Sequence, residues 1–155
     1  DELGVGIAVK GGEKWTAEFN YLRSDWRNSG FDGTEGFAVS GGSVFSSTVS
    51  QSFRAGFEFV PNRNDIRYYL RRCSYRAGVY YDQAYYKFDG NNVNSMGITL
   101  GITLPVFRWY NGITLGVDIG QRASTKNPDM IRERYANFVI GFNIHDIWFR
   151  KVQYQ

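Results

Sequence analysis

The chain has 155 residues, of which 43% are hydrophobic, 17% aromatic and 21% charged, and its formal net charge is +3. This length and composition fit one folded domain and exclude a disordered polymer. The basic residues are dispersed rather than gathered in one block, so we expect no nucleic-acid partner. The single cysteine, Cys73, excludes an internal disulfide and a cysteine-built metal site, and we expect neither a metal nor a cofactor.

No stretch of about 18 apolar residues predicts a transmembrane helix, and the first residues lack the features of a signal peptide. Instead, seven stretches alternate apolar residues with polar or small ones, the period of a β-strand whose two faces differ. They cover residues 3–10, 15–21, 53–59, 74–82, 96–106, 113–120 and 135–144. No amphipathic helix separates them, so the sequence predicts an all-β, antiparallel, up-and-down sheet.

The fifth stretch, residues 96–106, has the clearest pattern. Six apolar side chains alternate there with Gly97, Thr99, Gly101, Thr103 and Pro105. One face is therefore hydrocarbon and the other carries only small or hydroxylated groups, which is typical of a strand that faces lipid. Tight turns are predicted at Gly11-Gly12-Glu13 and at Asp89-Gly90-Asn91-Asn92, and the fourth strand is expected to end near the second turn.

Between the second and third stretches, residues 24–50 form a long polar segment that we interpret as an extracellular loop. Long loops are usually functional or mobile. Its aromatic residues among glycines are the candidates for contact with a ligand or partner: Trp26, Phe31, Phe37 and Phe45.

Two observations favour a transmembrane barrel over a soluble β-sandwich or lipocalin-like barrel. The aromatic residues fall at both ends of the predicted strands, as in membrane girdles; they include Trp15, Tyr21, Tyr81, Tyr85, Trp109, Tyr110, Trp148 and Phe149. The inferred inner face collects charges of both signs, which a water-filled or plugged lumen tolerates better than a dry core. This predicted lumen network comprises Lys10, Glu18, Arg54, Glu58, Arg76, Asp82, Asp118 and Arg122.

The expected location is the bacterial outer membrane, with the C-terminus periplasmic. Seven strands that end in the periplasm must begin outside the cell, whereas single-chain bacterial barrels normally have an even strand number. We therefore expect either the C-terminal part of a larger barrel, or one further strand within residues 37–50.

Several motifs resemble those of the long-chain fatty-acid transporter (FadL-type) outer-membrane proteins. They are Lys14-Trp-Thr-Ala-Glu-Phe-Asn-Tyr21 with Asp25-Trp26, Phe57-Glu-Phe-Val-Pro-Asn62, Tyr75-Arg-Ala-Gly-Val-Tyr-Tyr81, Gly97-Ile-Thr-Leu-Gly101 and Gly120-Gln-Arg122. The resemblance implies half of a roughly fourteen-stranded barrel that passes hydrophobic substrates through a gap in its wall. No motif here matches the hatch or the wall gap of that family.

The leading functional hypothesis is thus an outer-membrane channel or transporter for small hydrophobic compounds such as long-chain fatty acids. The alternatives are a plugged structural or partner-binding barrel within an outer-membrane complex, and a soluble lipid-binding barrel. Expected partners are outer-membrane lipids, hydrophobic small molecules and other envelope proteins. The only histidine, His145, adjoins Asp146, and neighbours on a strand point to opposite faces, so we expect no catalytic pair and no enzyme.

Overall fold

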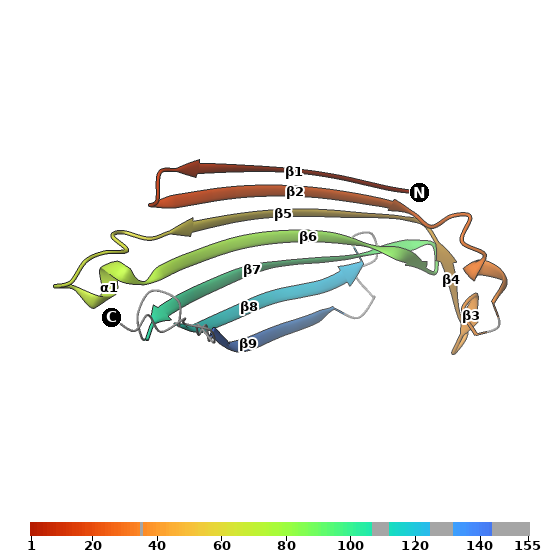
Figure 1. The fold of residues 1–155 in the computed structure, drawn as a ribbon. Coiled ribbons are helices and arrows are strands. Elements are labelled where there is room, and N and C mark those ends of the chain that lie inside the picture. The colour runs from red at the N-terminus through yellow and green to blue at the C-terminus, as the bar shows by residue number, and fades with distance from the viewer. Residues whose placement is uncertain (35, 107–111, 125–131, 144–155) are drawn as a thin grey trace, which may run out of the picture.

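The computed structural model describes residues 1–34, 36–106, 112–124 and 132–143, and they form one long, twisted antiparallel sheet (Figure 1). Seven long strands follow one another across it. They are β1 (Glu2–Gly11), β2 (Trp15–Asp25), β5 (Val49–Phe59), β6 (Ser74–Phe88), β7 (Asn91–Pro105), β8 (Gly112–Ser124) and β9 (Glu133–Asn143). The predicted all-β antiparallel class is confirmed.

The remaining elements are short and lie in the connections. They are the 3-10 turn η1 (Phe31–Gly33), the strands β3 (Val39–Ser40) and β4 (Ser43–Ser47), and the single-turn helix α1 (Tyr69–Arg72). Strand β3 pairs with β4, and β4 also pairs with the end of β6. Among the described residues, no helix is long and apolar enough to cross a membrane.

Strands β1 and β9 form the two edges of the sheet. Within the described ranges, β1 pairs only with β2 and β9 only with β8. Figure 1 shows the two edge strands running in the same direction on opposite sides of the sheet. Closure into a barrel and passage through a membrane therefore stay predictions.

Strand β6 ends next to the turn predicted at residues 89–92, whereas β7 begins earlier than the alternation predicts, because its first residues are mainly asparagines instead of aliphatic residues. They meet at a two-residue turn in which Asp89 and Gly90 have φ angles of 46° and 75°. Positive φ at both positions suits the right-handed twist of a hairpin, and Asp-Gly is a preferred pair for it. A bulge between Gln83 and Lys87 interrupts the β6–β7 ladder.

The register sorts side chains into two contrasting faces, because directly paired residues point to the same side of a sheet. One row of paired residues crosses from β2 to β9 as Ala17, Phe57, Ala77, Leu100, Val117 and Phe138. A row on the opposite face crosses as Asn20, Arg54, Tyr80, Gly97, Gly120 and Tyr135. We call these sides the apolar face and the polar face.

The described part of the chain has almost no hydrophobic core of its own. Its buried hydrophobic residues are Val60 and Cys73, both at one end of the sheet. By contrast, Leu100 is 57% exposed, Ile7 63% and Phe138 79%. A soluble sandwich or ligand-binding barrel would bury such residues, since an exposed apolar surface of this extent marks contact with lipid or another protein.

Candidate functional site

Aromatic side chains bracket the apolar face in two rows. Near one end of the strands, Trp15, Phe59 and Tyr75 are paired across β2, β5 and β6; towards the other end, Tyr21, Phe53 and Tyr81 are paired across the same strands. Tyr21 follows Trp15 by six positions along β2, which corresponds to about 20 Å at the rise of a strand. The rows are thus spaced comparably to the aromatic girdles and apolar band of a membrane barrel.

Ring contacts join the residues of the second row. The rings of Tyr21 and Phe53 lie 4.7 Å apart between centroids, and that of Tyr81 lies 6.5 Å from Phe53. The Trp15 ring lies over Gly11 and is 6.2 Å from that of Phe57. Of the other residues expected in girdles, Tyr85 lies beyond the second row, and Trp109, Tyr110, Trp148 and Phe149 lie outside the described residues.

The polar face carries all eight residues of the predicted charge network, because their paired positions share one side of the sheet. The guanidinium Nε of Arg76 lies 2.9 Å from Glu58 Oε2, and Arg54 Nη2 lies 3.7 Å from Asp82 Oδ1. Ser74 donates a second hydrogen bond of 2.9 Å to Glu58. These partly exposed cross-strand contacts join β5 to β6.

The remaining members of the predicted network find other partners. Glu18 accepts a hydrogen bond from Asn20, while Arg122 donates one of 3.0 Å to Ser95. Lys10 lies with Glu18 and the two ion pairs around an open depression of about 870 Å³ on the polar face. The polar face is therefore open to water, and most of its charged side chains contact a residue on another strand.

Asp118 belongs to a separate hydrogen-bonded cluster on this face. Tyr80 donates a 2.9 Å hydrogen bond to Asp118 Oδ1, and Asn137 donates one of 3.2 Å to Asp118 Oδ2. The hydroxyls of Tyr80 and Tyr135 are 2.6 Å apart. This cluster links β6, β8 and β9, and sequence reasoning missed both tyrosines, since only the register reveals that they share a row.

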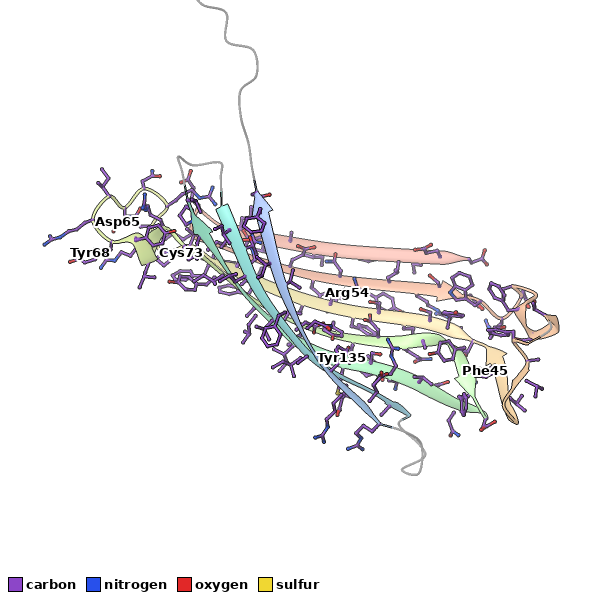
Figure 2. The ribbon with its side chains drawn as sticks, turned by 90° about the horizontal axis from the view of Figure 1, so that it is seen from below. Phe45, Arg54, Asp65, Tyr68, Cys73 and Tyr135 are labelled. Atoms are coloured by element: carbon purple, nitrogen blue, oxygen red, sulfur yellow. The ribbon has the colours of Figure 1, made fainter. Side chains whose placement is uncertain are left out.

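The four aromatic residues predicted as a contact loop lie together at the opposite end of the molecule from α1 (Figure 2, where Phe45 is labelled). Successive ring centroids lie 6.1 Å apart for Trp26 and Phe31, 5.5 Å for Phe31 and Phe37, and 6.3 Å for Phe37 and Phe45. Trp26 and Phe45 also contact tyrosines of β6. Residues 24–50 contain η1, β3, β4 and this ring stack, and both short strands lie within residues 37–50, where a further strand was expected.

At the α1 end, residues 61–73 connect β5 to β6 and contain four arginines; we call them the arginine loop. Asp65 Oδ1 accepts hydrogen bonds from the backbone N–H groups of Arg67 (2.8 Å) and Tyr68 (2.9 Å). The bond from Tyr68 is the main reason that the pKa of Asp65 lies below its ordinary value, and Arg67 and Arg71 add to the effect. Figure 2 shows Asp65, Tyr68 and Cys73 together there.

Cys73 closes the arginine loop and is fully buried, with its Sγ 3.6 Å from the carbonyl oxygen of Tyr69. Burial raises the pKa of the Cys73 thiol, so the thiolate is disfavoured at neutral pH. No three His, Cys, Asp or Glu side chains of the described residues gather as a metal-binding group.

Comparison with known families bears on the functional hypotheses. The BamG family model matches residues 1–155, the whole chain. The chain belongs to the BamG family. No curated protein and no solved structure matches it.

BamG membership overturns the resemblance to FadL-type transporters, which was wrong. The motifs that suggested it are short alternating strand segments, and alternation reports a two-faced strand rather than a particular family. BamG is a family of components of the BAM complex, which assembles outer-membrane proteins. Membership points to the bacterial outer-membrane region and to association with other envelope proteins.

Proposed function

We propose that this BamG protein is a partner-binding β-sheet component of the BAM complex that supports the assembly of outer-membrane proteins, and that it is neither a transporter nor an enzyme. The observation that carries the proposal is the match of the family model to the whole chain. It favours the partner-binding alternative over uptake of hydrophobic compounds.

The two faces of the sheet support a wall-like role at the membrane. The apolar face, with its two aromatic rows about 20 Å apart, suits contact with lipid or with another apolar protein surface. The polar face suits water or a polar protein segment, because its ion pairs remain partly exposed: the Arg76 and Glu58 side chains are 51% and 33% exposed. Such a sheet offers surfaces and edges to partners.

The test is depletion of the protein in its own cells, combined with purification of the tagged full chain in mild detergent. The proposal expects the BAM complex to copurify with it, and expects folded, heat-modifiable outer-membrane proteins to fall on depletion. Depleting an unrelated outer-membrane protein is the control. Normal levels of folded outer-membrane proteins and no BAM component in the purified sample would refute the proposal.

A liposome-swelling assay with the purified chain separates this role from transport. A partner-binding sheet predicts no solute flux above that of empty liposomes. Flux of hydrophobic solutes, together with a growth defect limited to those solutes, would restore the transport hypothesis. Recovery of the chain as a detergent-free soluble monomer would instead favour a lipid-binding barrel.

A further inference from the structure

The arginine loop concentrates the positive charge of the chain. Residues 61–73 hold Arg63, Arg67, Arg71 and Arg72 against one acidic residue, Asp65, so their net charge is 4 − 1 = +3. The whole chain also has a formal net charge of +3, and the remaining residues are therefore balanced. The expectation of dispersed basic residues was thus incomplete, because the imbalance lies in one short connection.

An apolar side chain stands at the centre of this charge. Ile66 is 98% exposed, and Leu70, four residues later in the chain, is 65% exposed. The backbone around Ile66 is fixed, since Asp65 accepts the two N–H groups that follow it and Asn62 N–H donates to Arg71 O at 2.8 Å. Ile66 is therefore held in solvent by an ordered turn, which is costly for an apolar side chain without a partner.

Two tyrosine hydroxyls anchor the arginine loop to the sheet, and two of its guanidinium groups stack on the Tyr68 ring. Tyr75 donates a 3.0 Å hydrogen bond to Leu70 O, and Tyr69 donates one of 2.9 Å to Pro105 O. The guanidinium carbon of Arg71 lies 4.8 Å from the centroid of the Tyr68 ring. Arg67 stacks on the same ring, with its guanidinium carbon 5.5 Å from the centroid. Arg71 already has a carboxylate partner within the loop, because its Nη1 lies 3.4 Å from Asp65 Oδ2. Stacking limits the freedom of the Arg67 guanidinium without occupying the hydrogen-bonding edge with which a guanidinium binds a carboxylate.

Figure 1 shows the arginine loop extending beyond the ends of the neighbouring strands. It follows the end of β5 at Phe59, which belongs to the aromatic row of Trp15, Phe59 and Tyr75 on the apolar face. If that row marks the limit of the hydrocarbon layer, Ile66 lies outside it, in water. Lipid tails do not reach an apolar side chain at that position, whereas a partner protein can bury it.

We propose that the arginine loop docks an acidic segment of another protein of the BAM complex, with Ile66 inserted into an apolar recess and Arg63 and Arg67 paired with carboxylates of that segment. The inference rests on the proposed function and names the chemistry of the partner. A central apolar anchor within charge-paired surroundings is the arrangement that dominates the energy of many protein interfaces. Here the anchor and its cations are preorganised before binding.

The test uses the full chain in its native cells, with a photoreactive phenylalanine analogue in place of Ile66. The same analogue in place of Val44, which is 54% exposed at the opposite end, is the positional control. The proposal expects position 66 to crosslink to one BAM protein, within a segment rich in Asp and Glu identified by mass spectrometry. It expects no such product from position 44.

Charge reversal then tests the pairing. Arg63→Glu with Arg67→Glu should lower the yield of that crosslink and the amount of copurified partner about tenfold, and reversing two carboxylates of the mapped segment to Arg should restore both. Arg23→Glu with Arg134→Glu makes the same charge change at the other end of the strands and should leave both unchanged.

The outcomes separate this inference from the proposed function. If wild-type chain associates with the BAM complex but the Arg63/Arg67 variant associates equally well, the docking inference fails and the proposed function stands. Crosslinking of position 66 to phospholipid, or binding of the purified chain to phosphatidylglycerol vesicles that is lost in the same variant, would assign the loop to lipid headgroups and also overturn it. If the wild-type chain does not associate with the BAM complex at all, the proposed function itself is refuted.

Discussion

The hydroxyls of Tyr80 on β6 and Tyr135 on β9 meet at 2.6 Å, although β7 and β8 lie between their strands. They can meet because the two residues between them in the row are Gly97 and Gly120. The two phenol side chains lie over this glycine floor, and a Cβ built on Gly120 would be 2.6 Å from Tyr135 Cζ. The two glycines thus allow a hydrogen bond between tyrosines of β6 and β9 across the two strands between them. We call this contact the tyrosine clasp.

Replacing Gly120 with Ala should therefore displace both rings and destabilise the sheet by about 1–3 kcal/mol, the usual cost of an added methyl group in filled space. Gly56→Ala is the matched control, because a Cβ there meets nothing within 4 Å on the same face. We expect Gly56→Ala to change stability by less than about 1 kcal/mol. Urea unfolding in detergent, followed by tryptophan fluorescence, measures both; equal effects would contradict the tyrosine clasp.

The ion pair between Glu58 and Arg76 should contribute little to stability, despite its 2.9 Å distance. Both side chains are partly exposed, so water screens the attraction and we expect a coupling free energy of about 0.2–1 kcal/mol. A double-mutant cycle with Glu58→Gln and Arg76→Gln measures it, and salt should weaken it. A coupling several times larger would show that a partner or plug desolvates this part of the polar face.

Leu100→Arg tests the environment of the apolar face. Leu100 is 57% exposed and lies in a row between the two aromatic rows. If this position is near the bilayer midplane, the substitution should cost about 2–4 kcal/mol and reduce the fraction recovered folded in the outer membrane. Thr99→Ser, on the polar face of the same strand, should be tolerated. A Leu100→Arg chain as stable as wild type would place this face against water.

Asp65 should order the arginine loop in a pH-dependent way. Its pKa is lower in the folded chain than in the unfolded one, so its contribution is fully present above about pH 4 and is lost as the pH falls through the lowered value. Pepsin cleavage near Tyr68 and Leu70 reports loop opening. Wild-type chain should resist cleavage better than Asp65→Asn at about pH 4.5 and lose this advantage progressively as the pH is lowered further. A ratio of cleavage rates independent of pH would contradict this role.

The sequence alone predicts most of the sheet, because the apolar alternation around Leu100 and the Asp89-Gly90 turn encode strand and hairpin locally. It also separates the two faces, so the charged residues of the polar face could be grouped in advance. The start of β7 was less predictable, since asparagines at residues 91, 92 and 94 hide the alternation there. Strand β4 lies within residues 37–50, where a further strand was expected.

Contacts between distant strands required the structure. Which carboxylate meets Arg54 depends on the β5–β6 register, and the meeting of Tyr80 with Tyr135 depends on three successive registers. A slip of one residue in any of them would move a side chain to the other face. The expected family was wrong for a related reason. Its motifs were strand-length segments, and such segments carry the alternation that many two-faced β proteins share.

The direction of the edge strands limits how the sheet can close. Since β1 and β9 run the same way, joining them directly would create a parallel ladder in an otherwise antiparallel wall. A continuous antiparallel ring therefore needs an odd number of additional strands between Glu2–Gly11 and Glu133–Asn143. Any closed antiparallel wall that contains these seven strands must therefore include one, three or another odd number of further β-segments, whichever protein supplies them.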